Sequence, residues 1–324
     1  MRITVLSGGV GGARFTRGLL ATLAQRGESP DVQVIANTGD DITMHGLRIC
    51  PDIDTILYTL GGGADEDRGW GLTDEGYRVQ EGLAAYGAEP GWFTLGDRDF
   101  ATHIARTQWL TEGASLTEVT GRLAARWGLP EKGVTLRPMS DVPVETHAVI
   151  DGPQGEEALH FQEWWVRGGA QPTPSRFIVA GLDRASAAPG VLDAIRTADL
   201  VLLPPSNPVV SIGIILGVPG VRDALRGTSA PVVGVSPIIA GRPVRGHADT
   251  CLDAIGVPST AAGVAGLYRD FLDGWLVDPA DAAPAPTRQG PTVRAHHRDL
   301  LMDGADDEAD LATAALDLAH DVRR

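Results

Sequence analysis

The first twenty residues, MRITVLSGGVGGARFTRGLL, constrain the fold more than any other segment. The run from Ile3 to Leu6 has the length and apolar content of a buried strand, and helical spacing resumes from Ala13 to Gln25. Glycines separate these two elements. The following segment VQVIA predicts a second strand that ends at Asn37. Strand, helix and strand in this order make a βαβ unit, so we expect a parallel sheet.

The alternation of strand and helix returns in the second half of the chain, in RFIVAG, VLDAIRTA, DLVLLPP, an apolar helix from about Ile212, and PVVGVSP. Before it, residues 61–135 carry helical patterns such as DFATHIARTQWL. Three strand-like runs then follow, VTLRP, ETHAVI and ALHFQEWWV, and the last has the aromatic content typical of a β segment. We expect one α/β domain over residues 1–324, with a doubly wound, mostly parallel Rossmann-like sheet, a helical insertion at 61–135 and a few additional β strands.

Composition excludes several classes of protein. A formal charge of −15 disfavours binding to nucleic acid, whose phosphates require a basic face. Cys50 and Cys251 are the only cysteines, which indicates neither a disulfide framework nor a thiolate zinc site. Prolines interrupt the longest apolar stretch, VLLPPSNPVVSIGIILGVPG, and the first residues lack the pattern of an export signal. We expect a cytoplasmic protein that does not enter membranes.

The glycine-rich turn matches the known phosphate-binding fingerprints only in part. The dinucleotide pattern G-x-G-x-x-G is met at Gly9 and Gly11, but its third place falls on Arg14, and Asn37 replaces the acidic partner of a ribose hydroxyl. A Walker loop needs a lysine, and Lys132 is the only one in the chain. Backbone N–H groups at a helix start can bind an anionic oxygen, or the turn can serve packing alone. The turn by itself leaves both readings open.

Short polar clusters follow the predicted strands or begin the predicted helices. They are NTGDD at 37–41, PDIDT at 51–55, LGDRD at 95–99, MSD at 139–141, PPSNP at 204–208 and SPIIAG at 236–241. Because the carboxyl ends of parallel strands meet at one edge of a sheet, these clusters predict a single pocket. Aspartate oxygens there suit a hard cation such as Mg²⁺, whereas the histidines are too scattered to form a metal site.

Each cluster also has a structural alternative. Asp54 could cap a helix that begins at Thr55, and Asp97 or Asp99 could cap the helix that follows them. Ser206 and Asn207, which lie between prolines, could be turn formers. No H-E-x-x-H or G-x-S-x-G pattern is present, so hydrolysis by a zinc site or a serine nucleophile has no support in the sequence.

Ten segments, in order from residue 1 to about residue 300, resemble the phospholactate transferase family of deazaflavin coenzyme biosynthesis. They are SGGVGGARFTRGL, NTGDD, CPDIDTILYTLGG, LGDRDFATHIART, EGASLTEVTGRLAARWGL, RPMSDVPVETH, HFQEWWVR, PPSNPVVSIGIIL, VSPIIAGRPVRG and GVAGLYRDFLDGWLVD. The chain is most similar to the actinobacterial branch. The resemblance implies a metal-dependent transfer of a phosphoenolpyruvyl or 2-phospholactyl group from a guanosine diphosphate-linked donor to Fo, the ribityl deazaflavin. The reaction releases GMP and belongs to the biosynthesis of coenzyme F-420.

The same resemblance assigns roles to individual residues. Asp54 would lie nearest the ribityl chain and the Mg²⁺ ion as the catalytic carboxylate, and Asp97 and Arg98 would contact Fo. Asp40 and Asp41 would be further metal ligands. The nucleotide would be held by a larger set, Gly8, Gly9, Gly11, Gly12, Asn37, Ser206 and Asn207. Relatives imply a homodimer. The alternatives are another nucleotide-diphosphate-dependent transferase and a non-catalytic nucleotide-binding regulator.

Overall fold

A seven-stranded sheet forms the centre of the computed structural model, which describes residues 1–153, 155–282 and 293–322. The strand order is β14-β13-β10-β9-β1-β2-β5, and each neighbouring pair is parallel. This arrangement confirms the predicted doubly wound α/β class. The strands are β1 (Arg2–Ser7), β2 (Asp31–Ala36), β5 (Val134–Pro138), β9 (Leu200–Leu203), β10 (Val232–Val235), β13 (Gly274–Val277) and β14 (Arg294–His297).

Helices cover both faces of this sheet. Ile3 and Val5 of β1 point into one apolar core and Leu6 into the other, which explains why a strand buried on both faces reads as an uninterrupted apolar run. The first core includes side chains of α1 (Gly9–Gln25), α2 (Pro51–Gly61), α5 (Leu116–Arg126) and α11 (Ala305–Asp321). The second includes side chains of α6 (Val191–Arg196), α7 (Ile212–Gly217), α8 (Val221–Gly227), α9 (Ala248–Ala254) and α10 (Ala261–Leu267).

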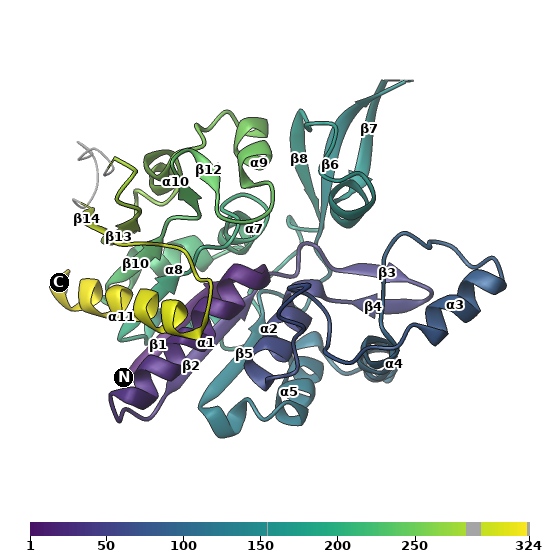
Figure 1. Ribbon diagram of the computed structural model, residues 1–324, viewed down its shortest axis with the longest axis horizontal. Coiled ribbons are helices and arrows are strands. Elements are labelled where there is room, and N and C mark those ends of the chain that lie inside the picture. The colour runs from purple at the N-terminus through teal and green to yellow at the C-terminus, as the bar shows by residue number, and fades with distance from the viewer. Residues whose placement is uncertain (154, 283–292, 323–324) are drawn as a thin grey trace.

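Smaller elements extend from the carboxyl edge of the sheet. Figure 1 shows the β6, β7 and β8 strands on one side and the β3–β4 hairpin with α3 on another. The antiparallel strands are β3 (Ile42–Met44), β4 (Leu47–Ile49), β6 (Glu145–Gly152), β7 (Gly155–His160), β8 (Arg176–Ala180), β11 (Ile238–Ile239) and β12 (Arg242–Pro243). The remaining helices are α3 (Arg78–Ala85), α4 (Asp97–Thr111), the 3₁₀ turn η1 (Pro130–Lys132) and the π turn η2 (Glu163–Arg167).

Two strand predictions were wrong in part. The run ALHFQEWWV is extended only to His160, and its aromatic half forms the π turn η2. Phe161 and Trp164 are buried there in a separate apolar cluster, so packing outweighs the β propensity of the aromatic residues. The run RFIVAG does form a strand, β8, but β8 pairs antiparallel with β6 and lies outside the parallel sheet. The remaining predicted strands of the main sheet are confirmed.

The stretch from 61 to 135 contains α3, α4, α5 and η1. Helix α5 has a full capping box at Ser115 and Glu118, and its apolar side is part of the core shared with α1 and α2. The description of residues 61–135 as a helical insertion within one domain remains a prediction. The predicted surface loop DPADAAPAPTRQGP lies largely outside the described residues.

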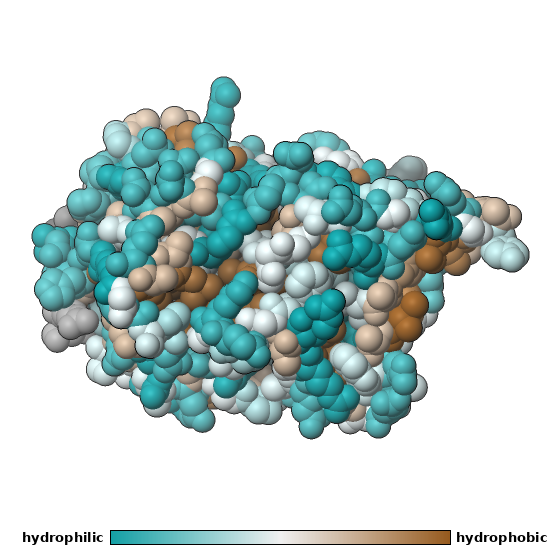
Figure 2. Space-filling view, turned by 60° about the horizontal axis from the view of Figure 1, so that its bottom comes forward, coloured by the Kyte–Doolittle hydropathy of each residue, from teal (hydrophilic) through white to brown (hydrophobic). Residues whose placement is uncertain are grey.

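The surface agrees with the strongly acidic composition. Figure 2 shows hydrophilic side chains over most of one face, with smaller hydrophobic areas between them. In the described part of the chain, no helix combines the length and the apolar character needed to cross a bilayer.

Helices α1 and α11 lie side by side (Figure 1), and a glycine allows their close approach. A Cβ atom added at Gly18 of α1 would lie 2.2 Å from the carbonyl oxygen of Glu308 in α11. The Glu308 side chain is fully buried and accepts hydrogen bonds from Arg14 Nε at 2.6 Å and Arg17 Nε at 2.8 Å. The contact therefore joins the two ends of the chain.

We predict that Gly18→Ala destabilises the protein by about 1–3 kcal/mol, the usual cost of overpacking, although alanine favours helix. Gly121→Ala in α5 is the matched control because a Cβ there meets nothing within 4 Å. It should stabilise by up to about 1 kcal/mol. Urea unfolding of both variants measures the difference. Equal effects would contradict the proposed close contact.

Candidate functional site

The loops after β1, β2 and β9 meet at the carboxyl edge of the sheet. From β1 the chain turns towards β2, and from β9 it turns the opposite way towards β10, so the carboxyl ends of β1 and β9 mark the topological switch point. Open α/β sheets bind ligands at this point. Gly8 follows β1, Ser206 follows β9, and the two are joined directly: Ser206 Oγ donates to Gly8 O at 2.7 Å and accepts from Gly8 N at 3.2 Å.

Asn37, at the end of β2, holds two aspartates together. Its Nδ2 lies 2.9 Å from Asp52 Oδ2 and 3.3 Å from Asp40 Oδ1, and its Oδ1 accepts the Gly39 N–H at 2.9 Å. Gln162 Nε2 donates to the other oxygen of Asp40 at 2.9 Å. All four polar side chains are buried. We call Asn37, Asp40, Asp52 and Gln162 the carboxylate cluster.

The two carboxylates of this cluster repel one another in a buried environment. Burial raises the pKa of Asp52 to about 6, against the hydrogen bond from Asn37. Burial, and then the charge of Asp52, raise the pKa of Asp40 well above its usual range. Among the described residues, no cationic side chain forms an ion pair with either carboxylate. A cation bound at this point would therefore relieve an existing electrostatic cost.

The four glycines of the turn have close neighbours. A Cβ at Gly8 would lie 2.7 Å from Asp52 Oδ2, one at Gly11 would lie 2.6 Å from Pro205 O, and one at Gly12 would lie 2.1 Å from Ser7 Oγ. Gly9 has φ +64° and donates its N–H to the Asp52 carboxylate. The packing explanation thus accounts for the glycines. The anion that the turn holds in this structure is the Asp52 carboxylate.

Helix α1 begins at Gly9 and not at Ala13, so the glycines form its first turn. The first N–H groups of a helix have no partner within the helix, which makes the Gly9 N–H available to Asp52.

Asn207 fixes the loop after β9, because its Oδ1 accepts the N–H groups of Val209 and Val210 at 2.9 and 3.2 Å.

Asp54 points away from the carboxylate cluster. Helix α2 begins at Pro51, so Asp54 lies inside the helix and the capping prediction was wrong. Asp52 and Asp54 are two residues apart, a rotation of about 200° around the helix, so their side chains face different neighbours. The Asp54 carboxylate forms a two-contact ion pair with Arg106 of α4, whose side chain is fully buried. His103 Nδ1 lies 3.7 Å from Asp54 Oδ2.

This ion pair lies in a wider polar network. Arg106 Nη1 also contacts Arg48 O at 3.3 Å and His103 Nδ1 at 3.1 Å. Burial lowers the pKa of His103 to about 4, which keeps the imidazole neutral near pH 7. Arg48 in turn reaches Asp41 Oδ2 at 3.3 Å, and burial raises the pKa of Asp41 to about 7 in spite of that cation.

The residues predicted to contact Fo begin helix α4. Asp97 is the first residue of the helix and Gly96 is its N-cap, so neither Asp97 nor Asp99 is the capping residue. Asp97 Oδ1 accepts the Val79 N–H at 3.0 Å, and Arg98 Nη1 donates to Thr73 O at 2.6 Å. Burial raises the pKa of Asp99 to about 6.

The structure brings together many of the predicted site residues, namely Gly8, Gly9, Asn37, Asp40 and Ser206. It sets Asp41 and Asp54 in ion pairs beside that cluster. Asp52, Gln162 and Arg106 were missed. Asp52 lies in the quoted segment PDIDT, where its position two residues before Asp54 was the available signal. Gln162 lies in a run that was read as a strand.

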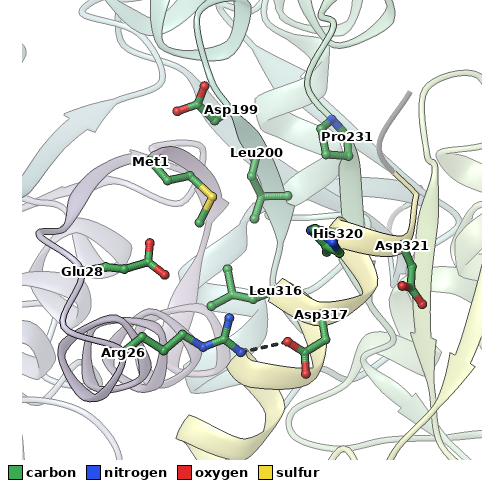
Figure 3. Close-up of a pocket in the computed structure, with 11 residues that line it drawn as sticks. Met1, Arg26, Glu28, Asp199, Leu200, Pro231, Leu316, Asp317, His320 and Asp321 are labelled. Atoms are coloured by element: carbon green, nitrogen blue, oxygen red, sulfur yellow. Dashed lines mark hydrogen bonds and ion pairs between the residues drawn. The ribbon is translucent and has the colours of Figure 1, made fainter.

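A cavity of about 480 Å³ lies at the opposite, amino edge of the sheet (Figure 3). Met1, Asp199 and Leu200 line it near the starts of β1 and β9, and Arg26 pairs with Asp317 across it at 2.9 Å. None of the predicted site residues borders it. The candidate site is therefore the carboxyl edge, where those residues lie.

The described residues contain no group of three or more His, Cys, Asp or Glu side chains arranged to hold a metal ion. Two carboxylates remain sufficient for Mg²⁺, which keeps several waters and usually takes one or two carboxylates together with phosphates of the substrate. The donor set of the carboxylate cluster, Asp40 and Asp52 with Asn37 between them, fits that requirement.

The fold and the buried polar cluster define an α/β protein whose acidic residues gather at the topological switch point of the sheet, the position at which open α/β sheets bind their ligands. Comparison with known proteins identifies the family to which this α/β protein belongs. The chain belongs to the 2-phospho-L-lactate transferase CofD family, whose model matches residues 3–312. The family resemblance noted from the sequence is therefore confirmed, and the chain is an enzyme of the transferase class.

Full-length relatives are similar throughout. A Thermobifida fusca protein named phosphoenolpyruvate transferase is 55% identical and covers 100% of this chain and 99% of its own length. A protein of the same name from Streptomyces griseus is 52% identical and covers 100% of this chain and 100% of its own length. One from Mycolicibacterium smegmatis is 51% identical and covers 98% of this chain and 99% of its own length. A solved structure of a UPF0052 family member from Bacillus halodurans has a TM-score of 0.59 at 16% identity, covering 97% of this chain and 98% of its own, and shares the fold.

We predict that Asp54→Asn destabilises the protein by about 3–5 kcal/mol, because it leaves the buried Arg106 guanidinium without its counter-charge. The double variant Asp54→Asn, Arg106→Gln should recover more than half of that loss, since two neutral amides can hydrogen-bond. Urea unfolding midpoints measure both. A single variant as stable as the wild type would show that the ion pair is not maintained in solution.

Proposed function

We propose that this chain transfers a phosphoenolpyruvyl group from a guanosine diphosphate-linked donor to the ribityl hydroxyl of Fo, with release of GMP, in coenzyme F-420 biosynthesis. The observation that carries the proposal is full-length identity of 51–55% to proteins named phosphoenolpyruvate transferase. The acidic cluster at the switch point is consistent with it, since the ligands are phosphorylated and the reaction requires charge neutralisation.

The chemistry sets two requirements. The acceptor hydroxyl must be aligned with the phosphorus, and the negative charge that develops on the phosphate oxygens must be neutralised. We assign the second task to Mg²⁺, which acts as a Lewis acid when bound and would be held by Asp40 and Asp52. The Asn37 amide orients both carboxylates, and Gln162 fixes Asp40. These contacts preorganise the ligands.

We assign the first task to Asp54 and the start of α4. Arg106 holds the Asp54 carboxylate in one orientation, next to the helix that carries Asp97 and Arg98. Asp54 would orient the ribityl hydroxyl, and Arg98 would bind the acceptor.

The nucleotide would lie over the loops after β1 and β9. Ser206 joins Gly8 across the switch point, and Asn207 fixes the following turn. Gly11 and Gly12 pack closely against Pro205 and Ser7, which holds the loops after β1 and β9 together beneath the proposed nucleotide position. We further propose a homodimer, as the family resemblance implies, and a cytoplasmic location, as the low cysteine content and the lack of an export signal indicate.

We predict that, with Fo, Mg²⁺ and equal concentrations of enolpyruvyl and lactyl donors, the enolpyruvyl product forms faster. The donors differ by two hydrogens at the acid carbon, and a methyl-sized shape difference is worth roughly 1–3 kcal/mol, so preference and not exclusion is expected. Mass spectrometry at early times separates the two products by two mass units.

A reaction without Fo is the control. Release of GMP in that control at the full rate would identify a hydrolase and refute the transfer reaction. A dominant lactyl product would refute the choice of donor and leave the acceptor and the fold unaffected.

A further inference from the structure

Trp70 is a large aromatic side chain left 44% exposed beside the proposed site. It belongs to the segment between α2 and α3. Two glycines with positive φ, Gly69 at +73° and Gly71 at +70°, flank it and set its backbone. The segment is closed on itself, because Asp65 N donates to Gly71 O at 3.1 Å and Gly69 N donates to Asp65 O at 2.8 Å.

The guanidinium of Arg68 lies against the Trp70 ring, with its central carbon 5.1 Å from the ring centroid. Its other contacts hold it there. Arg68 Nε donates to Asp65 Oδ2 at 2.8 Å, Nη2 donates to Leu72 O at 2.7 Å, and Nη1 contacts the hydroxyl of Tyr77. A ring that is supported by a fixed cation and otherwise exposed is a preorganised stacking surface.

This segment is attached to the residues that the proposed function assigns to the acceptor. Gly76 O accepts the Asp97 N–H at 2.8 Å, and Thr73 O accepts Arg98 Nη1 at 2.6 Å. A Cβ at Gly71, next to Trp70, would lie 3.7 Å from Asp99 Oδ2. Trp70 is therefore carried by the same loop that fixes the first turn of α4.

The other side of the segment reaches the carboxyl edge of the sheet. Arg245, just beyond the β11–β12 hairpin, donates from Nη2 to Arg68 O at 3.3 Å, across 177 positions of sequence. Glu66 pairs with Arg17 of α1. These contacts anchor the segment that carries Trp70 to α1, to α4 and to the residues that follow β12.

We propose that Trp70 is the stacking surface for the planar deazaflavin ring of the acceptor. The inference rests on the proposed function, which supplies an acceptor with a flat conjugated ring. Every flat ring offers a π face to an aromatic side chain, and loss of one such stack by alanine substitution costs roughly 1–3 kcal/mol. Arg98 would bind polar atoms of the acceptor beside this surface.

The test compares Trp70→Ala, Trp70→Phe and Tyr86→Ala. Tyr86 is 92% exposed at the end of α3 and serves as the matched control. We expect Trp70→Ala to raise the KM for Fo by about 5- to 150-fold while kcat and the KM for the donor stay near the wild-type values. Trp70→Phe should recover most of the affinity for Fo, and Tyr86→Ala should change none of these three constants.

Equilibrium titration of Fo, followed by its own fluorescence, gives a second readout. An unchanged Fo affinity in folded Trp70→Ala would overturn the proposal, and so would a raised KM for the donor alone, which would assign the surface to the guanine ring. If Trp70→Ala does not fold, equal Fo affinity of Trp70→Phe and a Trp70→Leu variant would overturn it. A wild-type protein that does not bind Fo would instead refute the proposed function.

Discussion

The parallel pairing of β1 with β2 on one side and β9 on the other is the constraint on which the site depends. It fixes Ser7 beside Ala36 and Val5 beside Leu202, so the loops that follow the three strands leave the sheet at one place. Gly8, Asn37 and Ser206 come together for this reason, although they are far apart in sequence. Removal of any one strand from this order would disperse the polar groups that we propose as the site.

The aspartates beside this edge are held in two different ways. Asp40 and Asp52 share an amide donor and have no cationic partner among the described residues, which makes them available to a metal ion. Asp41 and Asp54 are each paired with an arginine. A buried carboxylate paired with arginine keeps a fixed direction, whereas the charged form of a buried carboxylate without a cationic partner is stabilised when a metal ion binds. The roles that we propose for these residues, metal binding for the first pair and orientation of the acceptor for Asp54, rest on this division.

Much of the fold was predictable because its signals are local. The apolar run Ile3 to Leu6, the following helix and the strand after it are decided by periodicity, and the placement of polar clusters at strand ends follows from parallel topology. Asp52 and Arg106 were not predictable in the same way. The different surroundings of Asp52 and Asp54 depend on the placement of α2 in the fold, and the burial of Arg106 depends on the packing of α4, chiefly against β4 and α5.

The misread segment near Gln162 has a related cause. Phe161 and Trp164 suit a strand by propensity, but their burial against β6 and β8 is a tertiary effect that the local sequence does not report. The π turn that results carries Gln162 to Asp40 across 122 positions. Contacts between residues so far apart in sequence connect the sheet of β6, β7 and β8 to the carboxylate cluster. Hydrophobic periodicity does not predict them.

The binding of Mg²⁺ tests most directly the assignment of Asp40 and Asp52 as the residues that hold the metal ion. With GDP present in place of the donor, calorimetry at pH 8 should give a wild-type affinity that Asp52→Asn lowers by at least about ten-fold, as expected for loss of a direct ligand. The affinity of the wild type should also fall from pH 8 to pH 6, because Asp40 and Asp52 must lose protons to bind the ion. The double variant Asp54→Asn, Arg106→Gln should bind as the wild type does. Loss of Mg²⁺ binding in the double variant, with normal binding in Asp52→Asn, would contradict the account.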